Sequence, residues 1–85
     1  MKLNLSRSAQ KDLDKLPNEI AFRISNKIFE LIDNPYLYGS QKLGEDKGYR
    51  IKIGDYRIVY TINKENKEVT IIRVRHRKEV YRKLQ

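Results

Sequence analysis

Residues 49–60, YRIKIGDYRIVY, alternate between hydrophobic and polar side chains on either side of a central Gly-Asp pair. Alternation with a period of two indicates strands with one buried face, and two such runs around two turn residues predict a β-hairpin. The glycine supplies the positive φ that the first position of a type II′ turn requires. Pairing outward from this turn places Lys52 opposite Arg57 and Arg50 opposite Val59, so the three cations converge on one face. The other face is hydrophobic and contains Tyr49, Ile51, Ile53, Tyr56, Ile58 and Tyr60.

Two helices and a first strand are expected ahead of this hairpin. Met1 to Leu5 alternate and predict a short strand, and either Ser6 or Ser8 can cap a helix through Leu16. The proline that follows cannot continue this helix but suits the first turn of a second one, which is expected to end near residues 33–35. The apolar positions are Ala9, Leu13 and Leu16 in the first helix and Ile20, Ile24, Ile28, Leu31 and Ile32 in the second, with Phe22 and Phe29 beside them.

The segments around the hairpin complete the expected fold. Residues 36–48 are rich in glycine, serine and charge and predict a loop, with Leu43 as its anchor. A turn at residues 63–67 leads into a further strand, residues 68–75, which is apolar on both sides near its middle, as inner strands are. The order is β-α-α-β-β-β, an α+β fold with two antiparallel helices packed on one face of a small antiparallel sheet. A chain of 85 residues supports one core, so residues 1–85 are assigned to a single domain.

The net charge of +8 is concentrated in the second half of the chain. Residues 1–46 contain seven basic and seven acidic residues, whereas residues 47–85 contain twelve basic and four acidic ones. A one-sided excess of this kind is typical of a surface that binds a polyanion or an acidic partner. The chain has no cysteine and no apolar run long enough for a membrane span or a signal peptide, so a cytoplasmic protein without membrane contact is expected.

Metal-dependent chemistry is not expected, because the chain has one histidine, no cysteine and no spaced carboxylates in its basic half. The sequence contains no glycine-rich phosphate loop either, and no cofactor is expected. The acidic residues of the helices have basic residues three or four positions away and are interpreted as exposed ion pairs: Asp12, Asp14, Glu19 and Glu30.

The basic half combines cations with an imidazole and a phenol: Arg50, Lys52, Arg57, His76, Arg77 and Tyr81. Cations alone indicate phosphate binding without base recognition. With a proton acceptor and a proton donor added, RNA can be cut without metal when its 2′-hydroxyl attacks the adjacent phosphorus. Two interpretations therefore remain open from the residues themselves: general binding of nucleic acid or of an acidic partner, and metal-free RNA cleavage.

The segments YRIKIGDYRIVY and VTIIRVRHRKEVY closely resemble the RelE/ParE superfamily of toxins from toxin–antitoxin systems, and within it the RelE-like mRNA endoribonucleases. The resemblance extends over essentially the whole chain, including SAQKDLDKLP and the long second helix. It implies a type II toxin that cleaves mRNA in the decoding site of the ribosome and so inhibits translation. The alternatives within the superfamily are a ParE-like toxin that inhibits DNA gyrase by binding and cuts no RNA, and a degenerate toxin that retains only antitoxin and operator binding.

The resemblance also implies roles for individual residues. Lys52 and Arg57 would stabilise the transition state, Arg77 would support the leaving group, and Tyr81 would stack on or position a base. The residues expected to contact RNA are Arg50, Lys52, Arg57, Arg75, Lys78 and Arg82.

The general base is expected to be His76 or Lys52. The first hairpin cation, a lysine in some relatives, is Arg50 here, and a guanidinium stays protonated and makes a poor base. An imidazole titrates near neutral pH, and repulsion from two flanking arginines favours the neutral form of a lysine.

The partners implied by the resemblance are the ribosome, its mRNA and a tightly bound antitoxin. The charge of the second half predicts an acidic, RelB-like antitoxin that wraps this half with a segment that folds on binding. Operator DNA is expected to be contacted only through the complex with the antitoxin.

Overall fold

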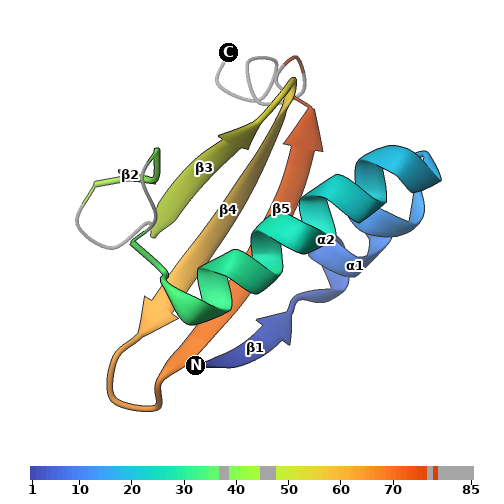
Figure 1. Ribbon diagram of the computed structural model, residues 1–85. Coiled ribbons are helices and arrows are strands. Elements are labelled where there is room, and N and C mark those ends of the chain that lie inside the picture. The colour runs from blue at the N-terminus through green and yellow to red at the C-terminus, as the bar shows by residue number, and fades with distance from the viewer. Residues whose placement is uncertain (37–38, 45–47, 77, 79–85) are drawn as a thin grey trace.

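A five-stranded sheet forms the centre of the computed structural model, which describes residues 1–36, 39–44, 48–76 and 78. The elements are β1 (Lys2–Leu5), α1 (Arg7–Asp14), α2 (Asn18–Asp33), β2 (Gln41–Lys42), β3 (Tyr49–Ile53), β4 (Tyr56–Asn63) and β5 (Glu68–His76). The strands lie in the order β1-β5-β4-β3-β2. The helix α2 crosses one face of the sheet, and α1 packs beside β5 (Figure 1). The α+β class and the predicted order of elements are confirmed, with β2 added.

Two features depart from the expected sheet. The short strand β2 pairs with β3 inside the segment predicted as a loop, with Gln41 opposite Arg50. The first strand, β1, pairs with β5 in parallel, so the sheet is mixed and not antiparallel throughout. Strands joined by a tight turn must run antiparallel, whereas strands connected through helices, as β1 is to the rest of the sheet, can run in parallel.

The strands β3 and β4 form the predicted hairpin in the predicted register. Every expected pair is present, including Lys52 opposite Arg57. The turn has a positive φ of 57° at Gly54, while Asp55 does not have a positive φ, as a type II′ turn requires. The hairpin was therefore fully specified by its local alternation and its turn residues.

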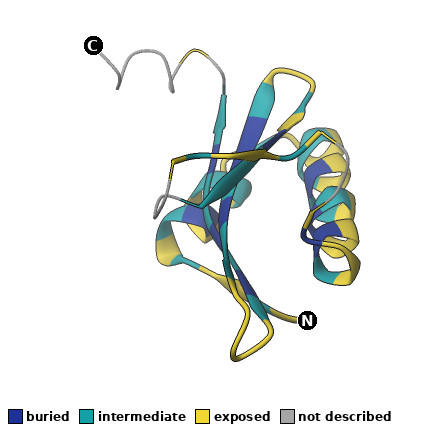
Figure 2. Cartoon of the chain, turned by 90° about the vertical axis from the view of Figure 1, so that its left-hand side faces the viewer, coloured by how far each residue is buried: buried dark blue, intermediate teal, exposed yellow. Residues whose placement is uncertain are grey.

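The hydrophobic face of the sheet packs against α2. The buried core consists of Ala9, Ile24, Ile28, Leu31, Ile51, Ile58, Tyr60, Val69, Ile71 and Val74. Phe22 and Phe29 are not part of it, because their positions on α2 face away from the sheet and leave them 68% and 62% exposed. Figure 2 shows this division of α2 into a buried side towards the sheet and an exposed side away from it. Within the described ranges, no helix combines the length and the apolar character needed to cross a membrane.

The strand β5 contains one more residue than the part of β4 that it pairs with. Val59 lies opposite Arg73 but its neighbour Tyr60 lies opposite Ile71, so Ile72 has no counterpart on β4. A bulge of this kind moves every later side chain of the strand to the opposite side of the sheet.

The bulge decides which way the basic end of β5 faces. Val74 is buried in the core. The alternating neighbours Arg73 and Arg75 therefore point to the face of the sheet away from α2. Without the extra residue, the alternation that buries Val69 and Ile71 would have turned both arginines towards the core.

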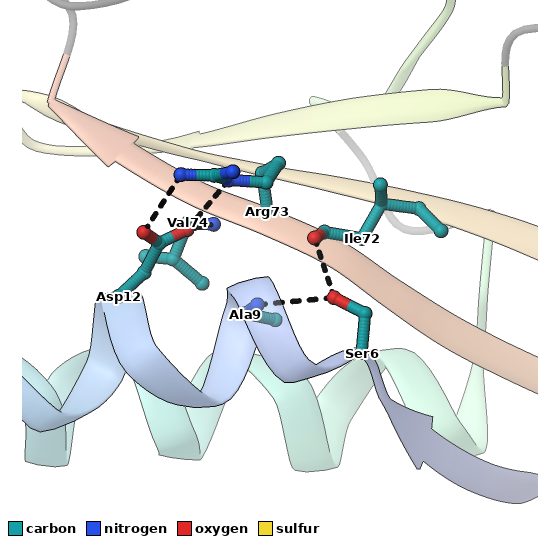
Figure 3. Close-up of polar contacts among 6 residues, drawn as sticks. All are labelled: Ser6, Ala9, Asp12, Ile72, Arg73 and Val74. Carbon is teal, nitrogen blue, oxygen red and sulfur yellow. Dashed lines mark hydrogen bonds and ion pairs between the residues drawn. The ribbon is translucent and has the colours of Figure 1, made fainter.

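The helix α1 begins at a serine that also contacts β5. The Oγ of Ser6 accepts a hydrogen bond from the backbone N–H of Ala9 at 3.0 Å and donates one to the carbonyl of Ile72 at 2.7 Å (Figure 3). Ser6 is therefore the cap, which settles the choice between Ser6 and Ser8. The strand β1 pairs with β5 only as far as Leu5. The hydrogen bond from Ser6 to Ile72 therefore occupies the next backbone carbonyl on this edge of β5.

Asp12 is not the exposed surface acid that the sequence predicted. Its Oδ2 accepts the backbone N–H of Val74 at 2.9 Å and Nε of Arg73 at 3.0 Å, and its Oδ1 accepts Nη2 of Arg73 at 3.0 Å (Figure 3). Its side chain is 13% exposed. Glu30, in contrast, forms the expected exposed pair with Lys27 at 2.8 Å. Asp12 differs because α1 holds it against the unpaired edge of β5, where a backbone donor needs an acceptor.

Gly48, just before β3, has no room for a side chain. Its φ is +87°, and a Cβ would overlap the carbonyl oxygen of Tyr60. We expect Gly48→Ala to lower the free energy of unfolding by about 3 kcal/mol or more, from the overlap and the left-handed backbone together. Gly44→Ala is the matched control: its φ is +69° and nothing lies within 4 Å, so about 1 kcal/mol is expected. If urea unfolding gave equal losses of stability for the two variants, the backbone around residue 48 would have moved to remove the overlap with Tyr60.

The phenol of Tyr60 holds the segment after α2 against the hairpin. It donates a hydrogen bond to the carbonyl of Pro35 at 2.8 Å, and its ring stacks on Tyr49 with centroids 5.7 Å apart. Burial raises the pKa of Tyr60 above the ordinary value of 10.0, although a hydrogen bond with Ser40 acts in the opposite direction.

The raised pKa of Tyr60 predicts a loss of stability in alkali. In the unfolded chain a tyrosine loses its proton near pH 10, before the buried phenol does. The contribution of this group is therefore complete below about pH 10 and falls as the pH rises through the folded pKa. We expect the stability advantage over Tyr60→Phe, measured by urea unfolding, to shrink as the pH rises above about 10. A constant difference over this range contradicts the assignment.

Candidate functional site

Three cations lie side by side across β3, β4 and β5, on the face away from α2. Lys52 is opposite Arg57 in the hairpin, and Arg57 is opposite Arg75 in the next strand pair. Directly opposed residues share a face and neighbouring strands lie about 5 Å apart, so the three side chains form one continuous group. We call Lys52, Arg57 and Arg75 the cationic row.

The middle member of the cationic row is the most buried. Arg57 is 8% exposed, whereas Lys52 at the β3 end is exposed to solvent. A guanidinium has five donors in a rigid planar arrangement, so burial gives Arg57 a more definite direction than a surface lysine has.

Arg50 extends the cationic row along β3. Its Nε and Nη2 both donate to Oε1 of Gln41, at 3.0 and 2.9 Å. Gln41 belongs to β2, directly opposite Arg50. This orienting residue has no recognisable signal in the sequence, because β2 is two residues long and lies within a glycine-rich segment. The two-strand register that would have identified Gln41 cannot be read from so short a strand.

His76 lies on the other side of the sheet from the cationic row. It is opposite Tyr56, and the two rings meet edge to face with centroids 5.1 Å apart. Its Nδ1 accepts the backbone N–H of Lys78 at 3.2 Å, so Nε2 carries the proton of the neutral ring. The general base was expected to be His76 or Lys52, and the bulge in β5 places these two candidates on opposite faces of the sheet, with Lys52 alone on the face of the cationic row.

The structure places four of the expected RNA-contacting residues together: Arg50, Lys52, Arg57 and Arg75. Lys78 is exposed, two residues beyond the last strand. Arg77, Tyr81 and Arg82 lie outside the described residues. Within the described ranges, no group of three histidine or carboxylate side chains is arranged to hold a metal ion.

This arrangement suits an anion with several oxygens. Adjacent like charges repel one another, and an anion bound among them relieves the repulsion. Guanidinium groups match the oxygens of a phosphate in pairs, and an ammonium adds a charge without fixed direction. The cationic row and Arg50 can therefore hold a phosphodiester and stabilise extra negative charge that develops on it.

Comparison with characterised proteins connects this site to a toxin family. A family model described as the ParE toxin of the type II toxin–antitoxin system parDE matches residues 3–81. The chain is 32% identical over 80 residues to toxin RelE of Mycobacterium tuberculosis, covering 92% of this chain and 82% of that toxin. It is also 32% identical over 83 residues to toxin RelG of the same organism, covering 95% of each.

Solved structures of RelE proteins share the fold. The toxin in the RelB–RelE complex of Methanococcus jannaschii is 29% identical, with a TM-score of 0.78 and coverage of 96% of this chain and 99% of that one. In the RelBE2 complex of M. tuberculosis the sequence identity is 29% and the TM-score 0.78, with coverage of 88% of this chain and 95% of that one. The isolated E. coli RelE toxin, at 23% identity, has the same fold with a TM-score of 0.78 over 99% of this chain and 98% of that one. The chain therefore belongs to the RelE/ParE superfamily and is a toxin of a type II toxin–antitoxin system.

Proposed function

We propose that this toxin is a metal-independent, ribosome-dependent mRNA endoribonuclease that inhibits translation. The observation that supports this most directly is the cationic row, with Arg57 buried between Lys52 and Arg75. Similarity to two toxins named RelE and RelG favours the same class.

In the proposed reaction, the 2′-hydroxyl of the RNA attacks the adjacent phosphorus. The hydroxyl proton passes to a base, the bond to the 5′-oxygen breaks while a proton donor or water protonates that oxygen, and the products are a 2′,3′-cyclic phosphate and a 5′-hydroxyl. Lys52 and Arg57 stabilise the charge on the phosphorane oxygens. With His76 on the other face, Lys52 is the candidate base that remains.

Residues outside the cationic row complete the proposal. Arg50 and Arg75 hold neighbouring phosphates, and Lys78 and Arg82 add further RNA contacts. Arg77 supports the leaving group, and Tyr81 stacks on or positions a base, by analogy with the superfamily pattern.

A cognate antitoxin is the proposed regulator. Structural relatives of this chain were solved as RelB–RelE complexes. An acidic antitoxin segment would complement the basic half of the chain and cover the cationic row, with operator DNA contacted only through that complex.

Induction of the toxin in growing bacteria tests the proposal. We expect protein synthesis to stop and cuts to appear within translated regions of messages, mapped by sequencing of 5′ ends. The second candidate is a ParE-like gyrase inhibitor, which the match to the ParE family model favours. Intact messages with a loss of negative DNA supercoiling would support that candidate and contradict RNA cleavage.

A further inference from the structure

A cavity of about 420 Å³ lies at the end of α1, on the other side of the β5 edge from the cationic row. The turn between the helices contributes Lys15 and Leu16, and the sheet contributes Tyr56 and His76. Arg75, the last member of the cationic row, lines it as well. The structural roles described above do not explain why this space is open and lined in this way.

The lining has a positive excess. Asp12 is its acidic member, and both carboxylate oxygens are already bound, to Arg73 and to the backbone of Val74. Lys15 and Arg75 carry further positive charge. In the part of the chain that the structure describes, the ammonium of Lys15 forms no ion pair. Among the described residues that line the cavity, positive charge therefore exceeds negative charge.

The cavity also presents two aromatic rings. Tyr56 and His76 meet edge to face, at 87° between their planes. Because Nδ1 of His76 accepts a hydrogen bond from Lys78, the protonated Nε2 is the ring's available donor. Proteins bind unstacked nucleotides with groups of these kinds. Aromatic rings stack on the base, an N–H donor binds the edge of the base, and cations bind the phosphate.

The position of β5 connects the cavity to the cationic row. The partner strand β1 pairs with β5 only as far as Ile71, so β5 is the outermost strand of the sheet from the bulge onward. Arg75 faces Arg57 in the cationic row and also lines the cavity. A strand of RNA bound on the row can therefore continue past Arg75 towards the cavity.

We propose that this cavity is a second nucleotide subsite of the toxin, which binds a nucleotide next to the cleaved phosphate. Tyr56 and His76 contact its base, and Lys15 and Arg75 contact its phosphate. The inference rests on the proposed function, since it takes RNA as the ligand of the cationic row. An acidic peptide can also satisfy the cations, but a nucleotide carries a planar base and a phosphate in one unit, which matches rings and cations side by side, so RNA is the ligand that the lining favours.

The test uses the one histidine of the chain as a reporter. The purified toxin is titrated with a dinucleotide and with a tetranucleotide whose 2′-O-methyl groups prevent attack on phosphorus, while the His76 ring protons are followed by NMR. We expect the tetranucleotide to shift the ring signals and to bind about tenfold more tightly than the dinucleotide. Lys15→Gln should weaken tetranucleotide binding about fivefold and leave dinucleotide binding unchanged.

Lys64→Gln is the matched control, because it removes the same charge at the opposite end of β4 and β5 and should change neither affinity. The subsite would be overturned if the His76 ring signals did not move while the dinucleotide still bound and Lys52→Gln abolished that binding. This result would leave the proposed function standing. Binding of neither oligonucleotide would overturn the subsite, whereas the proposed function is decided separately by the cuts in translated messages. Ring signals that respond to a short acidic peptide and not to the tetranucleotide would identify a protein-docking site and also overturn the subsite.

Discussion

Lys52→Gln is expected to slow cleavage of ribosome-bound mRNA about 100- to 1,000-fold, the cost typical of losing one preorganised donor to a developing oxyanion. Lys52 is exposed at the end of the cationic row, opposite Arg57. Its ammonium can approach a phosphorane oxygen directly, and glutamine of similar length carries no charge and cannot accept a proton as an amine does. The rate is measured in single turnover on ribosomes programmed with a defined message.

Two comparisons separate this effect from a change in fold or in net charge. Lys52→Gln should unfold at the wild-type urea concentration, because the side chain is exposed and has no hydrogen bond with the described residues. Lys64→Gln makes the same change of charge in the turn between β4 and β5 and should cleave at the wild-type rate. A Lys52→Gln variant that cleaves at the wild-type rate rules out the role assigned to this residue.

Arg57 allows a finer test of the same site. Arg57→Lys keeps the charge but loses the rigid arrangement of donors, so we expect a loss of cleavage that exceeds any loss of message binding.

Asp12→Ala is expected to lower the free energy of unfolding by about 3 kcal/mol. The substitution removes the acceptor of the Val74 N–H and both hydrogen bonds to Arg73. The Asp12 side chain is 13% exposed and that of Arg73 is 32% exposed, so the groups left behind are only partly rehydrated. Urea unfolding monitored by circular dichroism measures the change.

Asp14→Ala is the control on the same helix. Asp14 is exposed and accepts one hydrogen bond, from Gln10 at 3.0 Å, so a loss below about 0.5 kcal/mol is expected. Equal losses for Asp12→Ala and Asp14→Ala would mean that the contact with β5 contributes nothing beyond helix surface charge.

Local patterns were sufficient for the parts of the fold that depend on near neighbours. The hairpin register followed from side-chain alternation and one glycine turn, and the two helices followed from a serine cap, Pro17 and the spacing of apolar residues, although the structure was needed to choose Ser6 over Ser8 and to end α1 at Asp14 and not at Leu16. The pairing of Lys52 with Arg57 was predicted in the same way. Each of these features is determined within about a dozen residues of sequence, where turn chemistry and periodicity act directly.

Contacts between distant segments decided the rest of the site. Asp12 resembles any helical surface acid until α1 is placed against β5, more than fifty residues later. Gln41 has no visible role until β2 pairs with β3 and brings it to Arg50. Neither role leaves a periodic pattern in the sequence, because each depends on one side chain meeting one distant group.

The bulge at Ile72 shows this division most clearly. Alternation along β5 places successive side chains on opposite faces of the sheet. The extra residue reverses this assignment for every residue after the bulge. The amino-acid sequence therefore established the hairpin, its cations and the charge of the second half. The pairing of β5 with β4 put Arg75 beside Arg57 and turned His76 to the opposite face, because the sidedness of a strand depends on its register with its neighbour.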